Sequence, residues 1–356
     1  MAGSRRIDAL RGRRAVTKPK VSILVPTHNR APLLRQALES ALAQDYENLE
    51  VVVSDNASTD GTVSLRERYA SDPRVQWRRN PADIGVSANW RKLLYEFASG
   101  EYAKILCDDD YIAEKDHVSK AVRLIEANAL GLVFSGTGIL REPEGRLFDF
   151  TLDVPAVLSP RWWLENLGRR NRFACIFPNL ATNAVFHAET ARRYGAFENS
   201  VFGMDYELAL KFMLGSRTGY IGGMQCVERE HPAHDGGIAR LNVVMTGFVA
   251  FQRVREFGLS LGLDPAAVDR FVHRAMVVFV ESFALRAWFR ENGFGPRSWL
   301  ALRRSLAGID RRLVGKTLFS PRVIGKLALE RSPRIYPKAR MIYRLATGRP
   351  LGAPAA

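Results

Sequence analysis

Three consecutive aspartates, Asp108 to Asp110, are the residues of this sequence whose type and spacing best suit chemistry. They follow the apolar run 103–106, which is predicted to be a buried strand, so the three carboxylates should emerge together at its carboxyl end. Adjacent carboxylates repel one another and are kept where cations or hydrogen-bond donors offset their charge. A Mg²⁺ or Mn²⁺ ion that also binds phosphate would do this. The alternative is a solvated acidic turn before the next helix.

The elements that would position this triplet alternate between strands and helices. Apolar runs predict strands at 21–26, 49–54, 75–78 and 103–106, and the segments between them predict helices at 31–43, at 62–70 and up to about residue 99. Such alternation is typical of a parallel βαβ sheet with right-handed connections. The polar turns after the strands should therefore meet at one edge of the sheet, where open α/β sheets bind ligands.

The turn after the first strand excludes two common phosphate-binding sites. A dinucleotide site would require G-x-G-x-x-G there, but residues 26–30 read PTHNR and contain no glycine. No G-x-x-x-x-G-K-[ST] sequence occurs elsewhere. We therefore expect any phosphate to be held by a metal and by side chains.

Composition indicates a folded globular protein with basic ends. The chain has 356 residues, of which 47% are hydrophobic, and a formal net charge of +15. Residues 1–20 carry +6 and residues 286–356 carry +13, which leaves −4 for the part that contains the triplet. Three scattered cysteines predict neither a disulfide framework nor a Cys-type zinc site, and a reducing cytoplasm fits best. No apolar run is long enough for a membrane span, and no export signal is predicted.

Six segments together resemble the inverting GT-A fold glycosyltransferases of family 2. In chain order they read VSILVPTHNR, VVVSDNASTDGT, NPADIGVSANW, ILCDDDYI, NAVFHAETARRYGAFENSVFGMDYELALKFM and EREHPAH, and they span roughly residues 20–235. The resemblance implies an α/β fold of GT-A type, which has a Rossmann-like, mostly parallel sheet with helices on both faces. It also implies transfer of a sugar from a nucleotide-diphosphate sugar to a hydroxyl acceptor, assisted by Mg²⁺ or Mn²⁺.

The resemblance also implies roles for individual residues. The donor would be bound by Pro26, Thr27, Asn29, Arg30, Asp55, Asn80, Gly85, Asn89 and Asp108. The metal would be bound by Asp109, Asp110 and His231. This sequence departs from the family pattern at Cys107, which takes the first position of the D-x-D motif. We interpret Cys107 as a small buried strand residue, because a free cysteine usually packs as an apolar group.

The general base of the transfer maps to Asp205 by the same resemblance. It stands in FGMDYELALKFM, where Met204 takes the place of the usual glutamate and Glu207 follows two residues later. The alternative interpretation is that Asp205 is favoured only by the dipole of a helix N-terminus. Both interpretations can hold, because a helix end can direct a carboxylate into a cleft.

Other polar and aromatic residues have weaker indications. His231, His234 and Asp235 could be read as a zinc site, but Pro232 interrupts any helix that would place the histidines together. Trp162 and Trp163 could stack on an acceptor sugar, although one core and one surface tryptophan is the more common arrangement. Asn179, Thr182 and Asn183 are polar residues in an apolar segment and could face the acceptor.

The C-terminal region changes character. Apolar residues at 268, 272, 276, 279 and 283 predict a long amphipathic helix, and aromatics among sixteen Lys/Arg residues follow it. Such helices suit an anionic membrane surface, and the alternative is a solvated basic cap over the sheet. The predicted organisation is a basic tail at 1–20, a glycosyltransferase domain at 21–235 and a helical basic extension at 236–356.

The expected function is therefore a glycosyltransferase in bacterial surface polysaccharide or glycolipid synthesis. We expect a glycan or lipid-linked acceptor and a cytoplasmic location, with contact to the inner face of the plasma membrane as an option. A nucleic-acid-binding protein would account for the charge, but the basic residues avoid the part that holds the triplet, so no nucleic acid partner is expected. A nucleotidyltransferase could share the sheet, although it should begin with a glycine- and arginine-rich loop.

Overall fold

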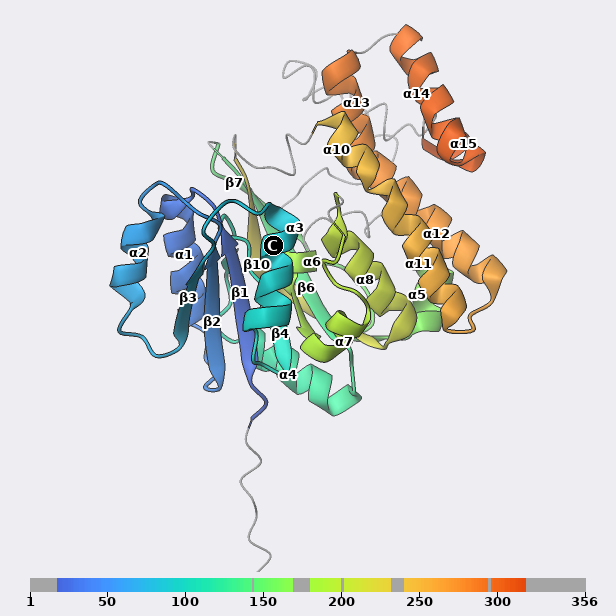
Figure 1. Cartoon of the computed structure of the whole chain (residues 1–356). Coiled ribbons are helices and arrows are strands. Elements are labelled where there is room, and N and C mark those ends of the chain that lie inside the picture. Colours follow the sequence, from blue (N-terminus) through green and yellow to red (C-terminus); the bar gives the residue numbers. More distant parts are fainter. Residues whose placement is uncertain are drawn as a thin grey trace, which may run out of the picture.

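The fold is built on one mixed sheet. The computed structural model describes residues 18–142, 144–168, 180–199, 202–231, 240–293 and 296–317. Within these residues the sheet has the order β3-β2-β1-β4-β9-β6-β10-β5, with β7 paired to β6 and β8 to β10 (Figure 1). The strands are β1 Val21–Thr27, β2 Leu49–Asp55, β3 Val75–Arg79, β4 Tyr102–Ile105, β5 Tyr111–Ile112, β6 Leu132–Arg141, β7 Arg146–Phe150, β8 Val157–Leu158, β9 Ala184–His187 and β10 Thr218–Glu230.

The long strands run mostly in one direction. β1 pairs in parallel with β2 and β4, and β2 pairs in parallel with β3. β9 lies antiparallel between β4 and β6, and β6 is parallel to β10. Strands β1, β2, β3, β4, β6 and β10 therefore end at the same edge, and the predicted mostly parallel sheet is confirmed.

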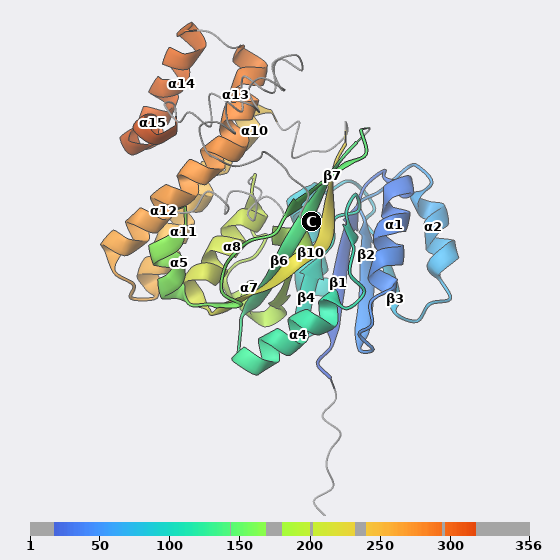
Figure 2. The ribbon, with the colours of Figure 1, turned by 180° about the vertical axis from the view of Figure 1, so that it is seen from behind.

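Helices cover both faces of the sheet, as Figures 1 and 2 show from opposite sides. The apolar sides of α1 and α4 pack on one face, and α7 and α8 pack on the other together with the π-helical turn Leu93–Phe97. The helices are α1 Ala31–Leu42, α2 Thr62–Tyr69, α3 Val86–Lys92, α4 His117–Asn128, α5 Pro160–Asn166, α6 Leu180–Asn183, α7 Ala188–Arg193, α8 Met204–Gly215, α10 Leu241–Thr246, α11 Phe248–Ser260, α12 Pro265–Phe279, α13 Leu285–Asn292, α14 Pro296–Ile309 and α15 Arg311–Thr317.

The C-terminal helices share the core of the sheet domain. The Tyr206 hydroxyl on α8 donates to the Ala275 carbonyl on α12 at 2.9 Å, and both helices belong to one apolar cluster. Arg253 on α11 forms an ion pair of 2.8 Å with Glu207 on α8. The predicted amphipathic helix corresponds to α12 and the π-helical turn Val280–Ala284 that continues it. The proposed domain boundary at 235/236 lies outside the described residues.

Helices α13 to α15 extend past the edge of the sheet at which the parallel strands end (Figures 1 and 2). In the described part of the chain, no helix has both the length and the apolar character that crossing a bilayer requires.

Candidate active site

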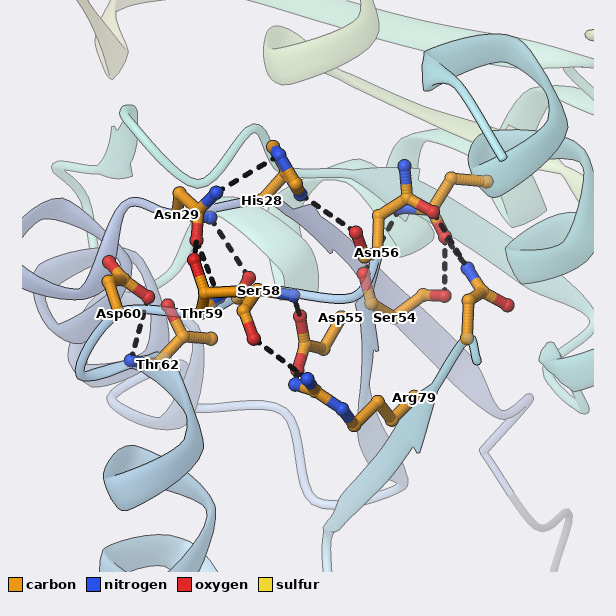
Figure 3. A network of polar contacts seen from close by, with 12 residues as sticks. His28, Asn29, Ser54, Asp55, Asn56, Ser58, Thr59, Asp60, Thr62 and Arg79 are labelled. Atoms are coloured by element: carbon orange, nitrogen blue, oxygen red, sulfur yellow. Dashed lines mark hydrogen bonds and ion pairs between the residues drawn. The ribbon is translucent and has the colours of Figure 1, made fainter. Parts of the chain in front are cut away.

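The polar turns after β1 and β2 are joined to each other at this edge (Figure 3). Asn29 has φ +54°, a left-handed conformation that asparagine tolerates better than most residues. Its backbone N–H donates to Ser58 Oγ at 2.9 Å, and its Oδ1 accepts from the Thr59 N–H at 2.7 Å. Asp60 accepts from the Ala31 N–H at 3.0 Å, in the first turn of α1. Hydrogen bonds within the protein therefore hold both turns in place without a ligand.

Asp55 is completely buried at the end of β2. Its Oδ1 accepts from the Ser58 N–H at 2.8 Å, and its Oδ2 forms an ion pair with Arg79. Asp55 and Arg79 are aligned in the parallel register of β2 and β3. Pro26 and Thr27 stand beside Ser54 and Asp55 in the register of β1 with β2. Sequence analysis overlooked Arg79, although the alignment of the two strand ends was a usable signal.

Asn80 and Asn89 are both 2% exposed and belong to an internal network. Asn89 Oδ1 accepts from Ser54 Oγ at 2.6 Å and from Asn80 Nδ2 at 3.0 Å. Lys92 Nζ donates to Asn80 Oδ1 at 3.0 Å. These amides hold the turn before α3. Gly85 is the N-cap of α3 and has φ +80°, a conformation that glycine adopts without strain. Direct contact of these residues with a donor stays a prediction.

The structure brings Arg30, Asp108, Asp109 and His231 together. The triplet emerges after β4, and its three residues are at most 5% exposed. Arg30 Nη1 lies 2.6 Å from Asp109 Oδ2 and 3.2 Å from Asp108 Oδ1. His231 Nε2 lies 3.2 Å from the same Asp109 oxygen. One carboxylate oxygen is thus the meeting point of the turn after β1 and the end of β10.

Asp110 is held by a different set of groups. Its Oδ2 accepts from Thr182 Oγ1 at 2.7 Å and its Oδ1 from the Arg229 backbone N–H at 3.0 Å. Behind it lies Lys104, a fully buried lysine of β4 whose Nζ donates to the Thr182 carbonyl and lies 3.6 Å from Cys226 Sγ. Burial lowers the pKa of Lys104. Sequence analysis overlooked Lys104, because one lysine in an apolar run gives no periodic signal.

The triplet concentrates negative charge in a poorly solvated place. Burial and, secondarily, the charge of Asp109 raise the pKa of Asp108 to about 6, and they raise the pKa of Asp110 well above its usual range. Ligand atoms of Cys107, Asp109 and Asp110 all lie within 4.8 Å of one another. Two hard oxygen donors in a charge-rich site fit a divalent cation.

The interpretation of Cys107 as a strand residue was wrong. β4 ends at Ile105, and Cys107 lies in the turn with a partly exposed side chain near the Asp109 and Asp110 carboxylates. The strand ends earlier than the apolar run predicts, because the run continues into the turn. The thiol therefore belongs to the site's potential donor set.

Asp205 lies in the first turn of α8 after Gly203, and it is not part of this cluster. Within the described residues, no hydrogen bond or ion pair joins it to the triplet. Its side chain borders a small apolar cavity lined by Ile105, Leu132, Ala184, Phe186, Phe197 and Leu208. Burial raises the pKa of Asp205 to about 6. Glu207 is instead taken up by ion pairs with Lys211 and Arg253.

Two further predictions concern the tryptophan pair and the polar residues before β9. Trp163 is fully buried and donates to Thr218 Oγ1 at 2.9 Å, while Trp162 is partly buried against it, so the arrangement is the core-and-surface pair. Asn183 donates to the Ser135 carbonyl at 3.2 Å within the sheet. Asn179, His234 and Asp235 lie outside the described residues.

The first comparison with known proteins concerns the part of the chain that forms this edge. The model of the family described as glycosyl transferase family 2 matches residues 22–182. Residues 22–182 are thus similar to glycosyl transferase family 2. The matched segment contains β1 to β8, the triplet and Thr182, whereas Asp205 and His231 lie beyond the match.

Relatives and solved structures extend the comparison. The GalNAc(5)-diNAcBac-PP-undecaprenol beta-1,3-glucosyltransferase of Campylobacter jejuni is 32% identical over 38% of this chain and 48% of its own length. The chain spans 21% to 48% of the length of the first three curated relatives. S. aureus TarS 1-349 with UDP-GlcNAc has a TM-score of 0.65 at 17% identity, covering 93% of this chain and 92% of TarS 1-349. This likeness establishes the GT-A fold. The mannosyltransferase PcManGT of Pyrobaculum calidifontis, in complex with GDP-Man and Mn2+, has a TM-score of 0.52 at 23% identity, covering 90% and 89%.

Proposed function

We propose that the protein transfers a sugar from a nucleotide-diphosphate sugar to a hydroxyl acceptor with inversion at the anomeric carbon. The observation that carries this proposal is the convergence of Arg30 and His231 on the buried carboxylate of Asp109, at the binding edge of a family 2 domain. Asp109 lies beside turns that the chain has already fixed. A basic group and a metal-binding carboxylate are the two features that a diphosphate requires.

The donor would lie across the ends of β1, β2 and β4. TarS and PcManGT are structural neighbours that hold UDP-GlcNAc and GDP-Man, which supports a nucleotide-sugar donor here. Pro26, Thr27 and Asp55 would border the base and ribose, with Arg79 fixing the Asp55 carboxylate. Asp108 would accept from the ribose or the sugar, and Arg30 would reach the diphosphate.

Asp109 and Asp110 would hold Mg²⁺ or Mn²⁺, with His231 beside Asp109. Such an ion supplies a positive charge that offsets the charge developing on the departing diphosphate. Thr182 and the Arg229 N–H would keep the Asp110 carboxylate oriented by donating to it. The buried Lys104 would help to hold Thr182 in place by donating to its carbonyl.

Asp205 would accept the proton of the attacking acceptor hydroxyl. An inverting transfer requires such a base on the acceptor side. The pKa of about 6 that burial gives Asp205 lies close to neutral pH, where a carboxylate is both ionised and a stronger base than an ordinary one. Its separation from the triplet agrees with a role toward the acceptor.

The acceptor that we propose is lipid-linked, within surface polysaccharide or glycolipid synthesis. The relative in Campylobacter jejuni is named for a PP-undecaprenol substrate, which supports this choice. We further propose a cytoplasmic protein that touches the inner face of the membrane peripherally. Exposed arginines on α14 support that contact, because each cation near an anionic surface contributes about 1 kcal/mol.

Release of nucleoside diphosphate from a panel of nucleotide sugars tests the proposed function. With Mn²⁺ the full chain should hydrolyse or transfer one of these sugars, and Asp109→Asn should lower the rate at least 100-fold, because the removal of one electrostatic stabiliser costs about that much. Asp72→Asn is the matched control, since Asp72 pairs with Arg74 away from the triplet. If no nucleotide sugar is turned over and none raises the melting temperature, the proposal is wrong.

A further inference from the structure

Arg30 holds the position in which a cation would neutralise the triplet. Its Nη1 contacts Asp109 Oδ2 at 2.6 Å and Asp108 Oδ1 at 3.2 Å, so a single guanidinium nitrogen bridges two carboxylates. These carboxylates are only 4% and 7% exposed, while the Arg30 side chain is 20% exposed. The cation therefore reaches inward from the solvent side of the site.

A guanidinium and a divalent metal cannot both bind this carboxylate without strong repulsion. Oxygen ligands lie about 2.1 Å from Mg²⁺, so a metal on Asp109 Oδ2 would lie within about 5 Å of the present position of Arg30 Nη1. Like charges this close in a poorly solvated place repel strongly. Metal binding to the free protein thus has to displace Arg30.

The displaced guanidinium has a suitable alternative partner. Arg30 starts from the turn between β1 and α1, at the edge where the proposed donor lies, and its side chain is already partly in solvent. A guanidinium binds phosphate oxygens in a planar, two-pronged manner. A nucleoside diphosphate that arrives with the metal would therefore offer Arg30 new acceptors as it loses the carboxylates.

We propose that Arg30 is an internal substitute for the metal, and that it moves from Asp108 and Asp109 to the diphosphate when a metal and a nucleoside diphosphate bind. This inference rests on the proposed function and adds an order to it. Metal binds weakly to the free protein and tightly only with the diphosphate. No covalent bond changes, because the step exchanges one set of ionic contacts for another.

Electron paramagnetic resonance of Mn²⁺ tests the exchange without any measurement of turnover. Arg30→Gln removes the competing charge, so the free variant should bind Mn²⁺ at least tenfold more tightly than the wild type. Arg74→Gln is the matched control, because it removes one arginine from an Arg–Asp pair far from the triplet. Its Mn²⁺ affinity should equal that of the wild type. Equal or weaker Mn²⁺ binding by free Arg30→Gln would overturn the inference.

In the presence of UDP, Arg30 should strengthen Mn²⁺ binding, whereas in the free protein it should weaken it. UDP should raise the Mn²⁺ affinity of the wild type at least tenfold, whereas in Arg30→Gln the gain should be smaller, since the diphosphate loses one of its partners. If UDP raises Mn²⁺ binding equally in both proteins, Arg30 does not move to the diphosphate. If neither protein binds Mn²⁺ with or without UDP, the metal site itself, and hence the proposed function, is wrong.

The melting temperature provides a second readout, which is needed if the repulsion between the unpaired carboxylates destabilises the Arg30→Gln variant. Arg30→Gln leaves adjacent carboxylates without their cation, so its melting temperature should fall in the absence of metal and should recover with Mn²⁺ more than that of the wild type. Arg30→Lys keeps a charge on a shorter side chain, whose ammonium nitrogen reaches less far toward the two carboxylates, so its melting temperature should lie between those of the wild type and Arg30→Gln. An Mn²⁺ stabilisation of Arg30→Lys no larger than that of the wild type would contradict the exchange.

Discussion

Among single residues, Asp205 has the property that a proton acceptor requires. Its carboxyl group borders an apolar cavity beside β4, β6 and β9, so water solvates the charged form poorly. Burial raises its pKa to about 6, whereas an exposed aspartate would be ionised well below that pH. The group is therefore ionised at neutral pH and becomes protonated within a mildly acidic range.

Asp205→Asn is expected to reduce sugar transfer at least 100-fold while the affinity for UDP with Mn²⁺ stays within twofold, because a base typically contributes 10²–10⁴-fold and does not bind the donor. In the wild type, kcat/KM should fall as the pH drops through about 6, since a raised pKa leaves the base protonated below that value. Rate measurements from pH 5 to 8 check both expectations. Asp269→Asn on α12 is the control. Substantial turnover by Asp205→Asn would remove the residue from this role.

Residue types and their order predicted which groups gather at the edge of the sheet, and the structure shows how they are connected. Arg30, Asp109 and His231 come from three distant segments, and only the fold shows that they share one oxygen. Lys104 could not be found, because its significance lies in what surrounds it and not in its sequence neighbours. The prediction that Cys107 lies in the strand was wrong, because apolar character alone does not show where a strand ends.

Among the elements, the ends of β1 and β2 opposite the site are joined by a buried carboxylate. Glu50 on β2 is 2% exposed, pairs with Lys20 at 2.6 Å and accepts from the Ser99 N–H at 2.9 Å. Burial alone would raise its pKa, but hydrogen bonds from Lys20, Ser22 and Ser99 outweigh that effect and lower the pKa. The charged form of Glu50 is therefore the stabilising one.

Glu50→Gln is expected to lower the free energy of unfolding by about 1–3 kcal/mol at pH 7, because buried donors lose a charged acceptor. Since the folded-state pKa is lowered, this contribution is present above the unfolded pKa and disappears as the pH falls through the folded pKa. The difference between wild type and variant should therefore shrink in acid. Urea unfolding at pH 7 and pH 3 measures it. Glu47→Gln, an exposed partner of Lys18, should change little at either pH.

The local sequence pattern predicted most of the strands and helices, but it did not predict how all the strands pair in the sheet. Strands 21–26 and 49–54 and helix 31–43 agree with β1, β2 and α1 to within a residue, because their apolar periodicity is strong. The antiparallel β9 between β4 and β6 was not predicted, since a four-residue apolar segment does not indicate its partner. That insertion brings Thr182, just before β9, next to Asp110.

On the scale of the whole molecule, α14 lies past the edge of the sheet (Figure 1) and carries exposed arginines. Leu302 and Leu306 face the core, while Arg297, Arg303 and Arg304 are exposed around Leu300, which is 47% exposed. Residues three and four apart are neighbours on a helix, so Leu300 is surrounded by these arginines. Within the described residues, none of these three arginines has an ion-pair partner.

Replacing Arg297, Arg303 and Arg304 together by glutamine is expected to weaken binding to vesicles with an anionic phospholipid roughly 100-fold, because each cation contributes about 1 kcal/mol. Binding of the wild type should also fall steeply with salt. Vesicle flotation at several lipid concentrations measures the effect. Changing Arg35, Arg66 and Arg68, exposed on α1 and α2, removes the same charge elsewhere. If both triple variants bind alike, α14 is not the contact surface.

The linked turns after β1 and β2 have a further consequence for how a ligand is received. Their backbone groups already bond to each other, as with Asn29 and Ser58, so an arriving nucleotide meets loops that need no ordering. Little of the favourable association energy is then cancelled by lost loop entropy. The turns after β1 and β2 should therefore keep their conformation when the nucleotide binds, and the proposed change is limited to the side chain of Arg30.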